Sequence, residues 1–141
     1  MTFFVDANII VYANSPSPQR ARCLEIVRAI VARRADGRTS PAVLQEIEHL
    51  ELSGRVRGLR GAARDAYEWF TPLLAITDEA ARLALDLDAP RLQAMDRLHV
   101  GTCRSHGIEV IVSADTGFDA VAGLRRVDPL DDAGIRSLIA A

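Results

Sequence analysis

The chain has 141 residues, of which 49% are hydrophobic and 26% charged, with a formal net charge of −2. This composition is typical of one soluble globular domain, here residues 1–141, and excludes a disordered tail, a collagen-like fibre and a disulfide scaffold. The apolar stretches are too short to span a membrane, the N-terminus lacks the basic region of a signal peptide, and the two cysteines match no metal or redox motif, so we expect a cytoplasmic protein.

Short apolar segments alternate with segments of helical periodicity along the chain. Runs such as Phe3-Phe4-Val5 predict buried strands, and apolar side chains spaced by three and four predict helices. Ser40 followed by Pro41 predicts a helix N-cap, and Gly107 predicts a helix end. In chain order, the expected elements are strand 3–5, helix 19–34, strand 38–40, helix 41–50, helix 54–70, strand 73–76, helix 77–87, helix 92–106, strand 108–112, a short helix, strand 126–127 and a helix from residue 131.

The alternation of strands and helices predicts an α/β fold with a parallel sheet that helices cover on both faces. In open sheets of this kind, ligands bind at the carboxyl ends of the strands. Residues that follow the predicted strands are therefore the first candidates for a functional site.

Several familiar kinds of site are excluded by the sequence. The chain contains no lysine, which excludes a Walker A phosphate loop and Schiff-base chemistry. The glycines do not form a dinucleotide-binding fingerprint, and neither a nucleophile elbow nor a His-Glu-x-x-His zinc motif occurs. The remaining candidates are carboxylates.

Three aspartates lie at the ends of predicted elements. Asp6 directly follows the first strand, Asp115 follows the strand 108–112 after two small residues, and Asp96 opens the helix that ends at His106. Each could be a helix N-cap, which is a role that aspartate favours. Asp6 is flanked by apolar residues, so its carboxylate would be costly to bury without a positive partner.

A glutamate is the fourth candidate. Glu46 borders the apolar stripe of the helix that begins at Pro41, while Glu48 and Glu51 border its other side. Periodicity does not choose among the three, and a solvated helix face is the default for each. Several carboxylates share a small site only around a cation, and an all-oxygen ligand set favours Mg²⁺ or Mn²⁺. Such ions serve phosphodiester chemistry.

At these residues the sequence resembles the PIN-domain ribonucleases, and among them the VapC-like toxins of bacterial toxin–antitoxin pairs. The family's opening stretch of hydrophobic-Asp-x-Asn-hydrophobic character is matched, with Ala7 where the family often has Thr or Ser. Four segments carry the resemblance: residues 4–12 with Asp6, residues 40–46 with Glu46, residues 95–100 with Asp96, and residues 110–119 with Asp115 and a following Phe-Asp.

The resemblance implies a three-layer α/β/α sandwich with a parallel, roughly five-stranded sheet and the acids at its carboxyl edge. It also implies Mg²⁺-dependent cleavage of RNA, with Mn²⁺ as an alternative ion. Asp6, Glu46, Asp96 and Asp115 would then be the catalytic and metal-binding residues, and Asn8, Ser113 and Asp119 would orient the ligands or the nucleophile. Members of the family usually form homodimers and are inhibited by a VapB-like antitoxin, for which we expect a basic side chain inserted among the carboxylates.

The arginines suggest where RNA would bind. Residues 19–64 contain ten arginines and five acids, so an acidic chain can still carry a basic face. If the segment after Gly54 is helical, Arg57, Arg60 and Arg64 share one face. They would contact RNA phosphates, or else form an ordinary solvated face.

Other functions remain open at this stage. One is a PIN-domain nuclease that processes RNA without being a toxin. A phosphohydrolase with Asp6 as covalent nucleophile is disfavoured, because Asn8 stands where such enzymes have a second aspartate and no lysine is present. An inert module that binds RNA or protein is disfavoured by the retention of all four acids.

Overall fold

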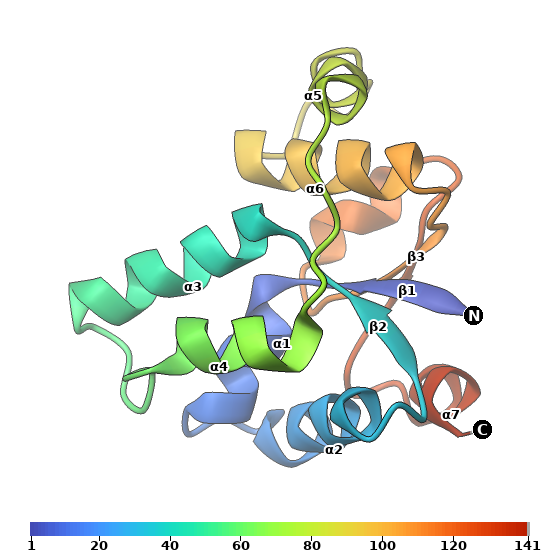
Figure 1. Cartoon of the computed structure of the whole chain (residues 1–141). Helices are drawn as coiled ribbons and strands as arrows, with labels where there is room; N and C mark the ends of the chain where they lie inside the picture. Colours follow the sequence, from blue (N-terminus) through green and yellow to red (C-terminus); the bar gives the residue numbers. More distant parts are fainter. Residues whose placement is uncertain (141) are drawn as a thin grey trace.

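The computed structural model describes residues 1–140, which fold around a parallel β-sheet (Figure 1). In this range the sheet has four strands in the order β2-β1-β3-β4, all parallel. The strands are β1 (Thr2–Val5), β2 (Asp36–Arg38), β3 (Val110–Val112) and β4 (Arg125–Val127). The predicted parallel sheet is therefore confirmed, with one strand fewer than the five expected.

The missing strand is the segment 73–76, which is irregular in the structure, so its prediction as a strand is wrong. It lies beside the end of β2 but makes a single backbone bond there, from Leu74 N–H to the Thr39 carbonyl at 2.9 Å. Pro72 directly precedes it and has no N–H to donate to a ladder. One bond anchors the segment without extending the sheet.

Helices flank the sheet on both faces and complete the predicted three-layer α/β/α arrangement (Figure 1). Helix α1 packs against α2, α3 and α4, while α2 also contacts α7, and α5 packs on α6. The helices are α1 (Ala7–Asn14), α2 (Arg20–Val31), α3 (Pro41–Ser53), α4 (Ala62–Phe70), α5 (Asp78–Leu85), α6 (Ala94–Ser105) and α7 (Asp132–Ile139), with a short 3₁₀ helix η1 (Thr116–Ala120). None of the helices within residues 1–140 is long and apolar enough to cross a bilayer.

The two central strands form the middle of the core. Phe3, Phe4 and Val5 of β1 and Ile111 and Val112 of β3 are fully buried, as expected for parallel strands covered on both faces. In the ladder Phe4 is opposite Ile111 and Val5 is opposite Val112. The two strands consequently end side by side, and the residues that follow them meet at one edge of the sheet.

The prediction of an arginine-rich helix from Gly54 to Phe70 is wrong for the residues before Ala62, where α4 (Ala62–Phe70) begins. Gly54, Gly58 and Gly61 have φ angles of 67°, 83° and 79°, which are left-handed and incompatible with a continuing right-handed helix. Glu51 holds the end of this loop, since its carboxylate accepts the N–H groups of Gly61 at 2.9 Å and Ala63 at 3.2 Å.

Candidate active site

Asp6 is a buried carboxylate at the carboxyl end of β1. It is 4% exposed and is also the N-cap of α1, so the capping role considered from the sequence is confirmed. Its Oδ1 accepts the Ala7 N–H at 2.8 Å, and its Oδ2 accepts the Ser113 hydroxyl at 2.6 Å and the Asn8 amide at 3.1 Å. Burial nevertheless raises the pKa of Asp6, with the neighbouring His99 acting in the opposite direction.

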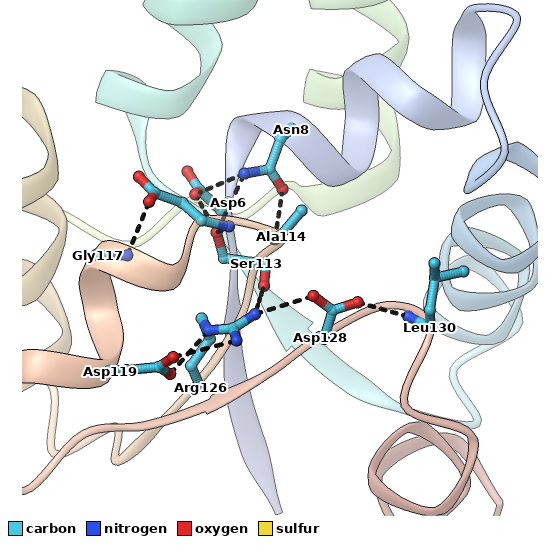
Figure 2. Close-up of polar contacts among 10 residues, drawn as sticks. Asp6, Asn8, Ser113, Ala114, Gly117, Asp119, Arg126, Asp128 and Leu130 are labelled. Atoms are coloured by element: carbon cyan, nitrogen blue, oxygen red, sulfur yellow. Dashed lines mark hydrogen bonds and ion pairs between the residues drawn. The ribbon is translucent and has the colours of Figure 1, made fainter.

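A polar network joins Asp6 to the segment that follows β3 (Figure 2). Asn8 donates to the Ser113 hydroxyl oxygen at 3.1 Å and accepts the Ala114 N–H at 3.2 Å. The same Ser113 oxygen accepts the Asp115 N–H at 3.0 Å. The structure thus places Asn8 and Ser113, two of the residues expected to orient ligands, in direct contact with Asp6.

Glu46 reaches the site from α3. Its Oε1 lies 2.5 Å from Nε2 of His99, and the same His99 nitrogen lies 3.9 Å from Oδ1 of Asp6. Ligand atoms of these three residues all lie within 4.8 Å of one another. The structure therefore distinguishes the three glutamates of this helix: Glu46 faces the site, Glu48 is exposed, and Glu51 caps α4.

Asp96 lies in the first turn of α6, where Gln93 and not Asp96 is the N-cap. Burial, together with the negative charges of Asp6, Asp115 and Glu46, raises the pKa of Asp96 to about 6, against the lowering effect of His99. Asp96 is therefore near enough to the other three carboxylates for their charges to affect its pKa, although only Asp6, Glu46 and His99 have ligand atoms within 4.8 Å of one another.

Asp115 is the exposed member of the group. It is the N-cap of η1, and its Oδ1 accepts the Gly117 N–H at 2.8 Å. Since Asp115 follows β3 through Ser113 and Ala114, it lies at the same sheet edge as Asp6. Because Asp115 is exposed, its carboxylate is accessible to solvent.

Asp119 is not brought to the other carboxylates. It pairs with Arg126, whose Nε lies 2.8 Å from Asp119 Oδ1, and this hydrogen bond lowers the pKa of Asp119. Arg126 also donates to the Ser113 carbonyl at 2.9 Å and to Asp128 at 3.0 Å (Figure 2). The expected orienting role of Asp119 can therefore act only indirectly, through Arg126 and the backbone of Ser113.

His99 is the site residue that sequence reasoning missed. Its side chain is completely buried, on the same face of α6 as Asp96, three residues earlier. The sequence showed a signal in this spacing, because residues at i and i+3 of a helix face the same way. No zinc motif includes His99, and its buried imidazole lies beside the predicted carboxylate ligands.

The three arginines proposed for RNA binding are all exposed, but they do not share a helix face. Arg57 and Arg60 lie in the loop between α3 and α4, and only Arg64 is helical. The guanidinium of Arg64 lies 5.9 Å from the centre of the Tyr67 ring. The predicted helical spacing of these three arginines is therefore wrong. The arginines still form an exposed basic region, which consists of the loop and the first turn of α4.

The donor set fits a divalent cation. Within residues 1–140, no arginine lies at ion-pair distance from Asp6, Glu46, Asp96 or Asp115, and His99 is the basic partner of two of them. Carboxylate oxygens are the ligands that Mg²⁺ and Mn²⁺ prefer. A cation held here would offset the mutual repulsion that raises the pKa of Asp96.

We expect Asp96→Asn to stabilise the metal-free protein at neutral pH. A carboxyl whose pKa is raised in the folded state, here to about 6 from 3.8, destabilises the fold as pH rises from about 4 to about 6. The neutral amide does not have this destabilising effect. Allowing for solvent screening, Asp96→Asn should therefore raise the free energy of unfolding by roughly 1–2 kcal/mol at pH 7 and leave it unchanged at pH 4. Urea unfolding in EDTA across this pH range measures the difference. Equal free energies of unfolding for the parent protein and Asp96→Asn at pH 7 would contradict the raised pKa of Asp96.

Comparisons with known proteins concern the family and the fold of the chain. The model of the PIN domain family matches residues 3–124. The chain is 29% identical to Ribonuclease VapC7 of Mycobacterium tuberculosis over 141 residues, covering 96% of each chain. It is 30% identical over 128 residues to Ribonuclease VapC13 of the same organism, covering 87% of this chain and 97% of the relative.

A solved structure has a similar fold. The toxin–antitoxin complex from Klebsiella pneumoniae contains a chain with a TM-score of 0.65 and 20% sequence identity, and the match covers 92% of this chain and 98% of that chain. At this identity the likeness concerns the fold alone.

Proposed function

The chain belongs to the PIN-domain family and is VapC-like, and from this premise we propose that it is a metal-dependent endoribonuclease that acts as the toxin of a toxin–antitoxin pair. The observation that carries the proposal is the grouping of Asp6, Glu46 and His99 ligand atoms within 4.8 Å of one another at the carboxyl edge of the sheet, with Asp96 near enough for its pKa to respond to Asp6, Glu46 and Asp115. Its support from relatives is that two similar proteins are named ribonucleases.

In this proposal the four carboxylates hold Mg²⁺, with Mn²⁺ as an alternative ion. The bound ion supplies a water of lowered pKa and neutralises charge that develops on the phosphate. Asp6 is held by three hydrogen bonds and provides a fixed ligand, while the exposed Asp115 lies where a phosphodiester can approach. Asn8 and Ser113 keep the Asp6 carboxylate in one orientation.

Burial of Asp6 argues against the competing phosphohydrolase reaction. Both of its oxygens accept hydrogen bonds, and the side chain is almost inaccessible. A covalent nucleophile needs a free, exposed oxygen to reach phosphorus. Attack by water needs no such exposure, because Asp6 then only binds and orients.

The test of the proposed activity uses purified full-length protein and a labelled RNA. We expect internal cleavage of the RNA with Mg²⁺ or Mn²⁺, and cleavage should stop in EDTA and return when excess Mg²⁺ is added. Asp6→Asn protein, purified in parallel, controls for contaminating nucleases. Cleavage that persists in EDTA would rule out the metal-dependent mechanism, and absence of cleavage on any RNA in a total cellular pool would rule out the activity.

We also propose two protein partners. One is a VapB-like antitoxin, in keeping with the similar chain in the Klebsiella pneumoniae toxin–antitoxin complex, and the other is a second copy of this chain in a homodimer. Within residues 1–140 His99 is the basic partner of Asp6 and Glu46 and no arginine pairs with the four carboxylates, so a basic side chain of the antitoxin would still meet an excess of negative charge. Arginine suits this role, because its guanidinium binds carboxylates in a bidentate way.

Arg57 and Arg60 are proposed to bind RNA phosphates from the loop between α3 and α4. Both are exposed and make no ion pair within the described residues, so their charges are available. Replacing both with Ala should weaken binding of every RNA alike. The slope of log affinity against log salt should fall by about 0.7 per lost contact on a single strand.

This slope is measured by salt titration with Asp6→Asn protein, so that the RNA survives. The matched control is Arg82→Ala with Arg136→Ala, which removes the same charge from helices α5 and α7, where each arginine is paired with an aspartate. We expect the control to keep the slope of the parent protein. An unchanged slope in the Arg57 and Arg60 double variant would remove these arginines from the RNA-binding surface.

A further inference from the structure

We propose that His99 is a positioning residue that holds the Glu46 carboxylate in the orientation needed to bind the metal ion. The inference rests on the proposed function and extends it to a residue that is not one of the four carboxylates. It is carried by the 2.5 Å contact between His99 Nε2 and Glu46 Oε1 and by the complete burial of the imidazole.

The imidazole is held rigidly from several sides. Its ring lies 5.4 Å from the ring of Phe4, a fully buried residue of β1, at an interplanar angle of 39°. Helix α6, which carries His99, is fixed closely against α5 at Gly101, where an added Cβ would lie only 2.2 Å from the Ala80 carbonyl oxygen. Such packing restricts the movement of the ring, and therefore of a carboxylate that is hydrogen-bonded to it.

Glu46, in contrast, depends on a partner for its position. Its side chain is 27% exposed and could turn toward solvent, and its Oε1 is hydrogen-bonded to His99. Like charges on Asp6 and Asp96 also repel it from the site. An N–H directed at Glu46 from the core opposes both tendencies.

The geometry favours an indirect role for His99 over a role as a metal ligand. A carboxylate only accepts hydrogen bonds, so Nε2 must carry the proton of the bond to Glu46 and has no free lone pair for a metal. The other nitrogen, Nδ1, is buried and has no hydrogen-bond partner among residues 1–140. His99 therefore acts on the site through Glu46, in the way that buried neighbours commonly orient metal ligands.

The test measures Mn²⁺ affinity of the full-length protein by titration calorimetry, which does not depend on cleavage. His99→Leu removes the donor and should weaken Mn²⁺ binding by about 10–100-fold, the range for loss of a group that orients a ligand. His99→Gln places an amide N–H at the reach of Nε2 and should restore most of the affinity. His99→Asn is the matched polar control, because its shorter amide does not reach Glu46.

A double-mutant cycle with Glu46→Gln separates positioning from general damage to the fold. If His99 acts through Glu46, His99→Leu should weaken binding little further in the Glu46→Gln protein. Melting temperatures of all variants are measured alongside, and the comparison of His99→Gln with His99→Asn stands even if His99→Leu does not fold. Cleavage rates of the folded variants should follow their Mn²⁺ affinities.

The outcomes separate this inference from the proposed function. If the unaltered protein does not bind Mn²⁺, the metal-dependent function is wrong. If it binds Mn²⁺ and His99→Leu binds equally well, or if Gln and Asn at position 99 are equivalent, the positioning role is wrong. Fully additive losses in the double-mutant cycle would also overturn it, because His99 would then act independently of Glu46.

Discussion

Replacement of Asp6 by Asn should reduce RNA cleavage by well over ~100-fold, since loss of a direct ligand exceeds the 10–100-fold cost of losing a group that orients one. The protein should still fold. The amide has the shape of the carboxylate and can keep the bond from the Ala7 N–H. Burial raises the pKa of Asp6, so a neutral side chain also relieves the cost of a buried charge. Initial rates on one RNA, with a melting curve for each protein, measure both effects.

The matched control for this substitution is Glu48→Gln. It removes the same charge from an exposed position of α3, two residues from Glu46, and should leave the rate near that of the parent protein. A low rate in both variants would indicate a general effect of charge on RNA binding or folding. Full activity of Asp6→Asn would show that Asp6 is not a metal ligand and would contradict the proposed mechanism.

The sheet and three of the four carboxylates could be predicted because short-range patterns determine them. The run Phe3-Phe4-Val5 can only be a buried strand, and a parallel sheet then brings the residue after β1 beside the residues after β3. Asp6 and Asp115 follow from this logic alone. Asp96 needed only a helix start, although its exact place, three residues after the N-cap, was not evident.

The rest depends on tertiary contacts or on single backbone angles. Glu46, Glu48 and Glu51 are equivalent by periodicity, and only the packing of α3 beside α6 identifies Glu46 as the partner of His99. His99 itself follows an apolar residue on a helix, where a sequence cannot distinguish a core histidine from a site residue. The helix predicted directly after Gly54 does not form, because three glycines in left-handed conformations outweigh the helical spacing of the arginines.

Expression of this chain without its antitoxin should arrest bacterial growth, whereas expression of Asp6→Asn should not. The reason lies in the accessibility of the site: Asp115 is exposed, and within residues 1–140 no arginine of the chain itself compensates the four carboxylates. In the proposed toxin–antitoxin pair, the antitoxin blocks the site. Co-expression of a VapB-like antitoxin should restore colony formation, and replacing the arginine proposed to bind the carboxylates with Gln should weaken that rescue. Viable counts after induction, at matched protein levels, measure the effect. Harmless accumulation of a protein that cleaves RNA when purified would instead favour a nuclease that processes RNA without acting as a toxin.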